Sequence, residues 1–341
     1  MSPLAALRAL RPPPWPDHAR YLEAAAARFG VAFAILDAEG GTVVRVGEGP
    51  RAAVIATAGR TCVYPLNRAS AMALATDKRF TRVALDAAGV DNLGGEHFFL
   101  SPRLRGLRAP GREVDDARAH MAARGHVAFC KPLAGSRGDF AERVTERAAF
   151  EAWLARVATA HDAILLQDIF EGDEYRVLLV DDDVVFVMQR FAPELVGDGA
   201  RSLAELHAER AALLAVAGLS PPVLRDPAVT DAGRAVRGDV VLAQGERVRL
   251  DDRRNFSAGA RTRLVAPADA PTGVVPIARR AREALGLRVA GVDVMVTDEG
   301  PRVVEVNGNP SVASLEEAGH ASIILDLWGE VLARMGLRGD V

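Results

Sequence analysis

Two short segments near the C-terminus, residues 289–296 and 302–307, constrain the fold most because they flank a turn signal. The residues between them, 297–301, read Thr-Asp-Glu-Gly-Pro, which is a typical turn sequence. Together the three segments predict an antiparallel β-hairpin. If Val296 opposes Arg302, the register of the whole hairpin is set.

In that register Asp293 faces Glu305, and the period-2 alternation of a strand places Asn307 on the same side. Two carboxylates that face each other repel unless a cation lies between them, and their oxygens suit Mg²⁺. The irregular sequence Asn-Gly-Asn-Pro that begins at Asn307 also favours a ligand site. A slip of one residue would instead favour an amphipathic hairpin with a solvated acidic face.

Composition indicates a soluble protein with two or three lobes, since 341 residues exceed one simple core. No apolar run approaches the ~20 residues of a membrane span. A net charge of −3 gives no overall attraction to nucleic acid or to a membrane. The basic run 103–112 is interpreted as a solvated loop, with RNA contact as the weaker alternative. Cys62 and Cys130 fit reduced core residues, so we expect a cytoplasmic protein without nucleic-acid or membrane partners.

Helix and strand signals alternate along the chain and predict an α/β fold. A capping box at Ser202 and Glu205 marks one helix start, the acidic turn 181–183 is interpreted as a solvated hairpin turn, and region 225–265 is expected to be irregular. Helices are expected at residues 19–29, 69–75, 79–88, 150–157, 203–217, 277–285 and 323–335. In the helix at 150–157, the i, i+3, i+4, i+7 spacing of Phe150, Trp153, Leu154 and Val157 predicts one apolar stripe. Strands are expected at residues 31–36, 42–46, 53–56, 127–131, 164–166, 175–180 and 184–188.

Two further groups of residues suit phosphate or nucleotide binding. Lys131 ends a strand and precedes the glycine-rich loop 135–138, whose backbone amides could approach phosphates. The loop is not a P-loop, and a plain turn is the alternative. Glu174 and Arg176 lie two apart on one strand and therefore share a face. They suit a ribose acceptor beside a phosphate-binding cation, or equally a surface ion pair.

In this order, these residues resemble motifs of the ATP-grasp superfamily. The resemblance is strongest to the ligase region of cyanophycin synthetases and to the glutathione-synthetase module of bifunctional glutathione enzymes. It covers residues 66–311. Asp77-Lys78 and Thr81 resemble the family's Asp-Lys-x-x-Thr segment, and the run 189–199 resembles a cyanophycin-type motif. By this resemblance, the residues expected to bind nucleotide are Lys78, Lys131, Gly135, Ser136, Gly138, Gln167, Asp168, Ile169, Phe170 and Glu174.

The resemblance implies an α/β ATP-grasp fold, with two lobes that clamp the nucleotide behind a small α/β domain. The expected ranges are 1–100 for the first domain, 101–175 for the small lobe with its glycine-rich flap, and 176–341 for the large lobe. The expected catalytic residues are Arg176, Arg190, Arg254 and Asn255. The expected ligands of two Mg²⁺ ions, with Mn²⁺ as an alternative, are Asp293, Glu305 and Asn307.

The activity implied is an ATP-dependent ligation of a carboxylate to an amine through an acyl phosphate. Small-molecule substrates, an amino acid or a short peptide, are expected, and a homodimer is allowed. Gly291 stands where D-alanine ligases carry an arginine, which argues against that branch. The alternatives are a ligase that modifies a protein tail, with residues 103–112 lining its groove, and a nucleotide-binding regulator without turnover.

Overall fold

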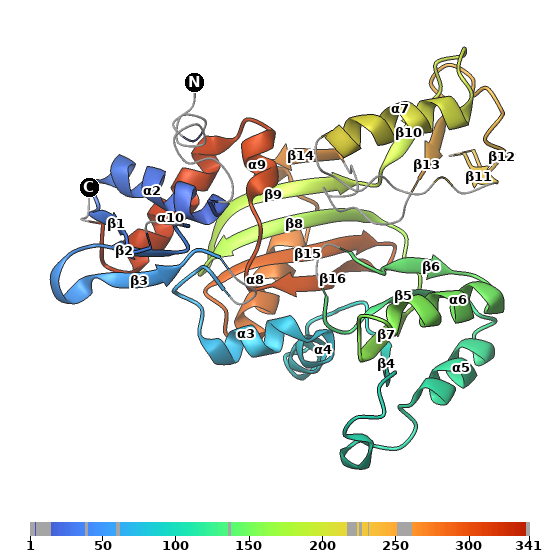
Figure 1. Ribbon diagram of the computed structural model, residues 1–341, viewed down its shortest axis with the longest axis horizontal. Helices are drawn as coiled ribbons and strands as arrows, with labels where there is room; N and C mark the ends of the chain where they lie inside the picture. Colours follow the sequence, from blue (N-terminus) through green and yellow to red (C-terminus); the bar gives the residue numbers. More distant parts are fainter. Residues whose placement is uncertain are drawn as a thin grey trace.

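A five-stranded antiparallel sheet forms the centre of the computed structural model (Figure 1). The structure describes residues 4, 15–37, 40–58, 62–135, 138–216, 224, 227–230, 232–250 and 261–338. The strand order of this sheet is β14-β9-β8-β15-β16. The bounds are Asp173–Val180 for β8, Asp183–Phe191 for β9, Arg261–Val265 for β14, Val289–Thr297 for β15 and Gly300–Asn307 for β16.

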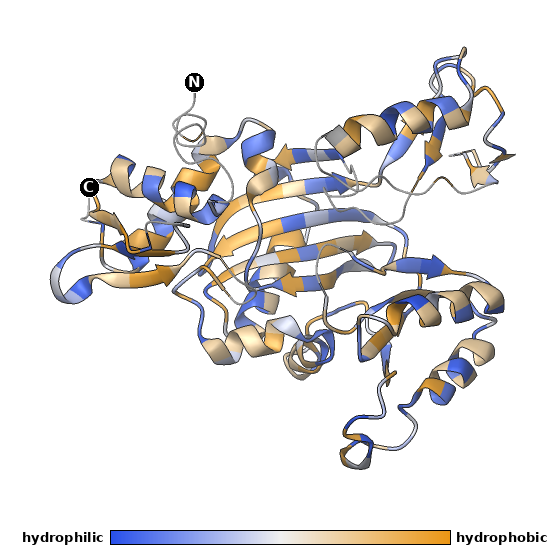
Figure 2. Ribbon diagram, in the orientation of Figure 1, coloured by the Kyte–Doolittle hydropathy of each residue, from blue (hydrophilic) through white to orange (hydrophobic). Residues whose placement is uncertain are grey.

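Side-chain alternation along these strands gives the sheet two different faces. Tyr175, Val177 and Leu179 of β8 lie in one apolar core with residues of helix α8 (Val274–Ala284). On the opposite face, Leu178 and Val180 pack with helices α2 (Asp17–Phe29) and α10 (Ala321–Arg334). This second core covers only one end of that face. Figure 2 shows β8 and β9 hydrophobic at that end and more hydrophilic toward the other.

A four-stranded sheet, order β4-β7-β5-β6, forms a separate lobe. Its helix α6 (Arg147–Val157) carries the predicted apolar stripe, and Phe150, Trp153, Leu154 and Val157 are all buried. The other bounds are Glu96–Phe99 for β4, Val114–Ala123 for α5, Ala128–Pro132 for β5, Glu142–Val144 for β6 and Ala163–Gln167 for β7. Strands β4 and β6 and helix α5 were not expected from the sequence.

Two smaller units complete the described chain. The N-terminal sheet contains β1 (Phe33–Ile35), β2 (Val43–Val46) and β3 (Ala53–Ala56), and helices α3 (Ala69–Thr76) and α4 (Lys78–Ala87) follow. An arm carries α7 (Leu203–Val216) over the paired strands β10 (Glu194–Val196) and β13 (Arg247–Arg249) (Figure 1). The remaining bounds are Ala228–Val229 for β11, Ala235–Val236 for β12 and Ala313–Glu317 for α9.

The capping box at the start of α7 is confirmed. The Ser202 backbone amide donates to Glu205 at 2.8 Å, and the Glu205 amide donates to the Ser202 hydroxyl at 3.3 Å. The expectation that region 225–265 is irregular was wrong, because this region contributes β11, β12, β13 and the edge strand β14. Strands β11 and β12 pair with each other but have only two residues each, too few for an alternation pattern. Strands β13 and β14 are short and rich in arginine, and they pair with β10 and β9, which lie outside the local sequence.

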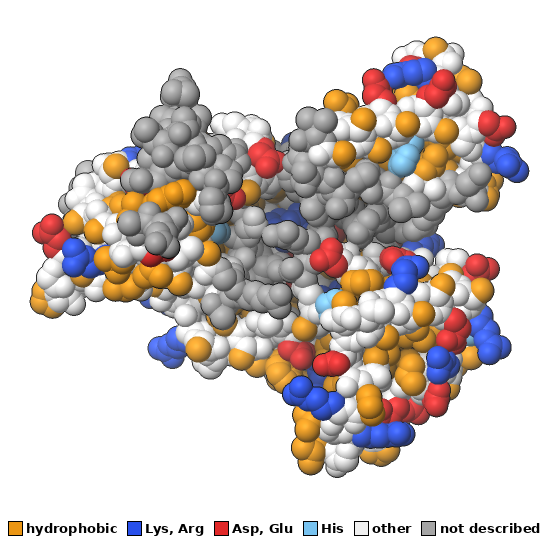
Figure 3. Space-filling view, viewed as in Figure 1, with side chains coloured by type: hydrophobic (Ala, Val, Ile, Leu, Met, Phe, Trp, Pro, Cys, Tyr) orange, Lys and Arg blue, Asp and Glu red, His pale blue; other side chains and the backbone are white. Residues whose placement is uncertain are grey.

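The basic run 103–112 is less solvated than expected. Arg108 stacks on the ring of Phe99 at 4.0 Å and donates to the Ser101 carbonyl at 2.8 Å, while Arg112 forms an ion pair with Glu96. These contacts use both arginines to hold the loop to β4. Figure 3 shows acidic and basic side chains mixed over this lobe, not gathered into a field of one sign. Among the described residues, no helix has the length and apolar character to cross a membrane.

The acidic turn between β8 and β9 has three ion-paired side chains. Asp181 accepts from Arg288 at 2.8 Å and from Arg334 at 2.9 Å. Asp182 and Asp183 are exposed, and they pair with Arg282 and Arg334. The turn is therefore a hairpin turn, as predicted, but Asp181 holds helix α10 against the sheet instead of being simply solvated. The three domain ranges stay a prediction.

Candidate nucleotide and metal site

The hairpin β15–β16 brings Asp293 and Glu305 together by a route the sequence did not indicate. Val296 pairs with Pro301 instead of Arg302, so the expected register near the turn was wrong by one residue. A β-bulge next to Asp293 then absorbs the extra residue, Val304, and restores the pairing of Asp293 with Glu305. The predicted cross-strand pair is thus confirmed, and Asn307 pairs with Gly291 two positions further along.

The half of the central sheet that α2 and α10 leave uncovered carries a charged cluster, defined here as Glu174, Arg176, Arg190 and Asp293. Arg176 donates to both oxygens of Asp293 at 2.7 Å, in a bidentate pair. Arg190 donates through one nitrogen to Asp293 and to Glu174, each at 3.1 Å. Three adjacent strands supply these side chains at paired positions, because Asp293 pairs with Arg176 and Glu174 pairs with Arg190.

The surrounding charges hold Asp293 ionised. Its side chain is 5% exposed, and burial alone would raise the pKa of the carboxyl. Arg176 and Arg190 outweigh that effect and lower the pKa of Asp293 below its usual value. The interpretation of Glu174 and Arg176 as a surface ion pair is wrong, since their partners are Arg190 and Asp293 and all four side chains are largely buried.

Two lysines approach this half of the sheet from other elements. Lys131 lies on β5 of the four-stranded lobe and is 8% exposed. Lys78 is the first residue of α4, whose N-cap Asp77 accepts from the amides of Arg79 and Phe80. The ammonium of Lys78 lies 3.1 Å from Glu305 and donates to the Gly135 carbonyl at 3.4 Å. Between the two lobes, four cations therefore meet three acids. The cations are Lys78, Lys131, Arg176 and Arg190, and the acids are Glu174, Asp293 and Glu305.

Comparisons with known proteins point to one superfamily. Residues 233–327 match the model of the RimK-like ATP-grasp domain. The chain is 26% identical over 303 residues to a glutathione biosynthesis bifunctional protein of Desulfotalea psychrophila, covering 84% of this chain and 37% of that protein. It is 26% identical over 255 residues to a cyanophycin synthetase of Geminocystis herdmanii, covering 69% of this chain and 26% of that protein.

The fold agrees with these sequence matches. The crystal structure of a bifunctional glutathione synthetase from Pasteurella multocida superposes with a TM-score of 0.52 at 16% identity, covering 94% of this chain and 44% of that one. The chain has an ATP-grasp fold. It spans between about a quarter and two fifths of the length of the two relatives named above.

ATP-grasp ligases generally use ATP with Mg²⁺, and the oxygen donors on the hairpin fit such an ion. No group of three His, Cys, Asp or Glu gathers among the described residues. The possible metal ligands on the hairpin are the carboxylates of Asp293 and Glu305 and the side-chain amide of Asn307. Each carboxylate oxygen can accept twice. Oδ2 of Asp293 accepts from both arginines, whereas Oδ1 accepts only once, from Arg176. One lone pair of Oδ1 is therefore available to a metal ion. The side-chain nitrogen of Asn307 is buried and has no acceptor among the described groups, and rotating the amide would present its oxygen instead.

The other predicted residues are only partly brought to the site. Gln167 ends β7 and donates to the Gly94 carbonyl at 2.5 Å, which ties the end of β7 to the segment that precedes β4. Of the three positions that follow, Asp168 pairs with Arg124, Phe170 lies under Arg302 of β16, and Ile169 lies between them in the sequence. Of the glycine loop, Gly135 and Gly138 are described, whereas Ser136 lies outside the described residues, as do Arg254 and Asn255.

Asn67 is a positioning residue that sequence reasoning missed. Its side-chain nitrogen donates to the carbonyls of Val289 and Gly308, both at 2.8 Å. Its oxygen accepts from the amides of Arg288 and Val289 at 2.8 and 2.9 Å. One amide thus joins the start of β15 to the loop that follows Asn307. No local signal could identify it, because these partners lie more than 200 residues away in the sequence.

The burial of Lys131 predicts that nucleotide binding depends on pH. Burial, reinforced by the nearby Lys78 and partly offset by Glu305, Glu174 and Asp293, lowers the pKa of Lys131 to about 8. The ammonium that attracts phosphate is therefore lost as the pH rises through 8. We expect the affinity for ADP with Mg²⁺ to fall between pH 7.5 and 9.5, with proton uptake on binding at the upper end. Calorimetry in buffers of different ionisation enthalpy measures both. Lys131→Met should bind weakly and without this pH dependence, and a flat wild-type profile would contradict the assignment.

Proposed function

We propose that the chain is an ATP-dependent carboxylate–amine ligase that forms an amide or peptide bond and releases ADP and phosphate. The observation that carries the proposal is the meeting of Lys78 and Lys131, from two different elements, with Asp293 and Glu305 on one hairpin. Without a ligand the site holds four cations and three acids, a small positive excess that favours a polyphosphate. The named relatives, which include a glutathione biosynthesis protein, support an amino acid or a short peptide as substrate.

The proposed reaction has two steps. A carboxylate oxygen of the first substrate attacks the γ-phosphorus of ATP, the bond to the bridging oxygen breaks, and ADP leaves with that electron pair. The amine of the second substrate then attacks the acyl carbon, phosphate leaves, and the amine loses a proton. Phosphoryl transfer depends on positioning and on neutralising charge. The lysines provide both, because Lys131 is fixed on a strand and Lys78 begins a capped helix.

The hairpin would hold two Mg²⁺ ions through Asp293, Glu305 and Asn307, and Mn²⁺ would be an alternative ion. Bound there, these ions would supply charge to the β- and γ-phosphate oxygens. Arg176 and Arg190 are engaged with Asp293, so we assign them to orienting that carboxylate, in addition to adding positive charge beside the phosphates. We assign Glu174, which accepts from Arg190, as the acceptor for ribose hydroxyls.

A product screen tests the proposal. The enzyme is incubated with ATP, Mg²⁺ and pairs of amino acids or short peptides, and phosphate, pyrophosphate and new amides are measured. We expect phosphate release that requires both substrates and Mg²⁺. Pyrophosphate release would exclude the acyl-phosphate route. ADP binding without turnover on any pair would favour the alternative, a nucleotide-binding regulator.

A further inference from the structure

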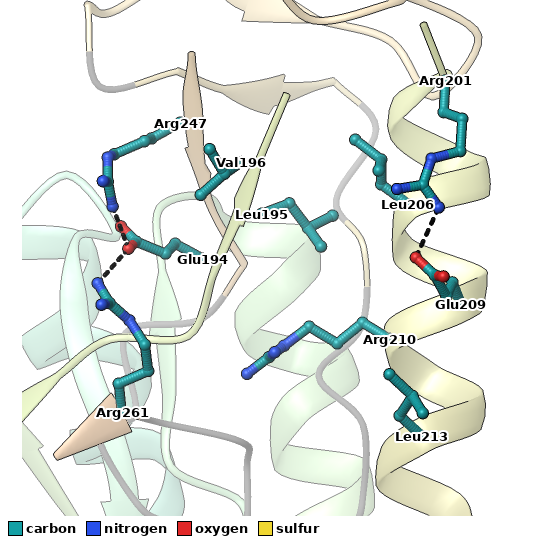
Figure 4. Close-up of a pocket in the computed structure, with 10 residues that line it drawn as sticks. All are labelled: Glu194, Leu195, Val196, Arg201, Leu206, Glu209, Arg210, Leu213, Arg247 and Arg261. Atoms are coloured by element: carbon teal, nitrogen blue, oxygen red, sulfur yellow. Dashed lines mark hydrogen bonds and ion pairs between the residues drawn. The ribbon is translucent and has the colours of Figure 1, made fainter. Parts of the chain in front are cut away.

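A cavity lies outside the proposed nucleotide site, where helix α7 passes over strands β10 and β13 (Figure 4). It has a volume of about 370 Å³, within the range of pockets that bind small ligands. Strands β10 and β13, helix α7 with Arg201 just before it, and the first residue of β14 supply its walls. The lining residues are Glu194, Leu195, Val196, Arg201, Leu206, Glu209, Arg210, Leu213, Arg247 and Arg261.

The charges of this cavity favour an anion. Its lining contains four arginines and two glutamates, although the whole chain has a net charge of −3. One oxygen of Glu194 accepts from both Arg247 and Arg261, as Figure 4 shows, so a single carboxylate is shared by two guanidinium groups and one positive charge stays in excess. The side chains of Arg247 and Arg261 remain 46% and 60% exposed. They can therefore donate to a further carboxylate without being drawn out of a buried site.

Between these charged groups lies an apolar surface. Leu195 and Leu206 are buried beneath it, whereas Val196 and Leu213 are 43% and 66% exposed. Exposed leucine and valine side chains beside paired arginines suit a ligand that has an apolar side chain next to an acidic one. None of the ten lining residues is aromatic, so the cavity lacks the stacking surface that single-stranded nucleic acid requires.

The cavity lies close to the charged cluster along the chain. Arg190, which donates to Asp293, is four residues before Glu194, and Thr262 of β14 pairs with Arg190. An extended chain spans at most about 3.5 Å per residue, so the Cα atoms of Arg190 and Glu194 are at most roughly 14 Å apart. A peptide of about four residues can therefore reach from the cavity to the proposed phosphoryl-transfer site.

We infer that this cavity binds an acidic–apolar segment of a peptide substrate, about four residues from the group that reacts. The inference rests on the proposed function, because it names the substrate class of that ligase. The arginines would pair with the acidic side chain of the segment, and the exposed Leu213 and Val196 would contact its apolar neighbour. The cavity would thereby fix the direction in which the substrate enters the nucleotide site.

Fluorescence anisotropy with labelled heptapeptides tests the inference. The probe has an Asp-Leu pair, four glycines and a C-terminal Glu, and in its counterpart Lys replaces Asp. We expect the wild-type protein to bind the acidic probe at least tenfold more tightly. Arg247→Glu should weaken acidic-probe binding at least tenfold and improve binding of the Lys peptide. The matched control is Arg234→Glu, because Arg234 is equally exposed on the same arm, pairs with Glu246 and does not line the cavity.

A second variant distinguishes a loss of peptide binding from a loss of folding. Leu213→Asp changes a side chain that is 66% exposed, so the unfolding transition should stay in place while the acidic probe binds more weakly. Equal binding of both peptides, or unchanged acidic-probe affinity in a folded Arg247→Glu protein, would overturn the inference, as would a labelled oligouridylate binding more tightly than the acidic probe. Calorimetry with ADP and Mg²⁺ is run in parallel. If nucleotide binds but the acidic probe is not preferred, only the proposed role of the cavity is rejected. If nucleotide does not bind, the proposed function is rejected.

Discussion

Replacing Glu305 by Gln is expected to reduce ATP-dependent phosphate release by about 10²–10³-fold, the effect typical of removing one preorganised charged or polar group from a transition state. Gln keeps the size of the side chain but removes the charge that would hold a metal ion and that lies 3.1 Å from Lys78. Lys131→Ala should have an effect of the same order, because it removes a fixed ammonium on β5. Steady-state phosphate release on the pair identified by the screen measures both.

The matched control is Glu299→Gln. Glu299 lies in the turn of the same hairpin, is 73% exposed and pairs with Arg302 at the surface. This variant should retain wild-type activity. Far-UV circular dichroism and urea unfolding check that the inactive proteins are folded. Wild-type turnover in Glu305→Gln would remove the metal assignment and leave the hairpin with a structural role only.

Replacing Asp293 by Asn is expected to lower the free energy of unfolding by about 3–5 kcal/mol, because Arg176 would then be buried without a carboxylate and Arg190 would keep only Glu174. The pKa of Asp293 is lowered in the folded protein, so this stabilisation is complete above the unfolded carboxyl's pKa. It is lost as the pH falls through the lower, folded value. Urea unfolding at pH 7 therefore measures the full effect.

A control variant and a double variant help to interpret that result. Asp115→Asn removes an ion pair with Arg118 in which the carboxylate is 89% exposed, and it should leave stability unchanged within error. Combining Asp293→Asn with Arg176→Met should recover part of the loss, because the uncompensated charge of Arg176 disappears while Arg190 keeps Glu174. A loss below about 1 kcal/mol in Asp293→Asn would mean that the charged cluster is hydrated and not buried.

Local patterns predicted most of the secondary structure and several site positions. The stripe on α6 and the capping box of α7 depend on residues three or four apart, and both are confirmed. Alternation placed Glu174 and Arg176 on one face, but only the sheet order showed that Asp293 and Arg190 lie beside them. The ion pairs of Asp293 link strands distant in sequence, and no spacing rule contains that information.

The hairpin shows the limit of register arguments. The sequence places the turn correctly, yet a one-residue change at Pro301 would have separated Asp293 from Glu305 without the bulge. A bulge depends on the local twist and packing of the paired strands, which no alternation pattern encodes. Asn67 was missed for a related reason, since its four hydrogen bonds join segments that approach one another only in the folded sheet.

The hydrogen bonds of Asn67 also bear on the order in which the site forms during translation. The Asn67 side chain leaves the ribosome long before β15 and β16, the last strands of the described chain, and it finds its acceptors only after both have emerged. Until then the central sheet lacks the strand that carries Asp293, and Arg176 and Arg190 have no carboxylate between them. A nascent chain therefore cannot bind nucleotide at a half-built site, and synthesis of the final hairpin completes the sheet and the site together.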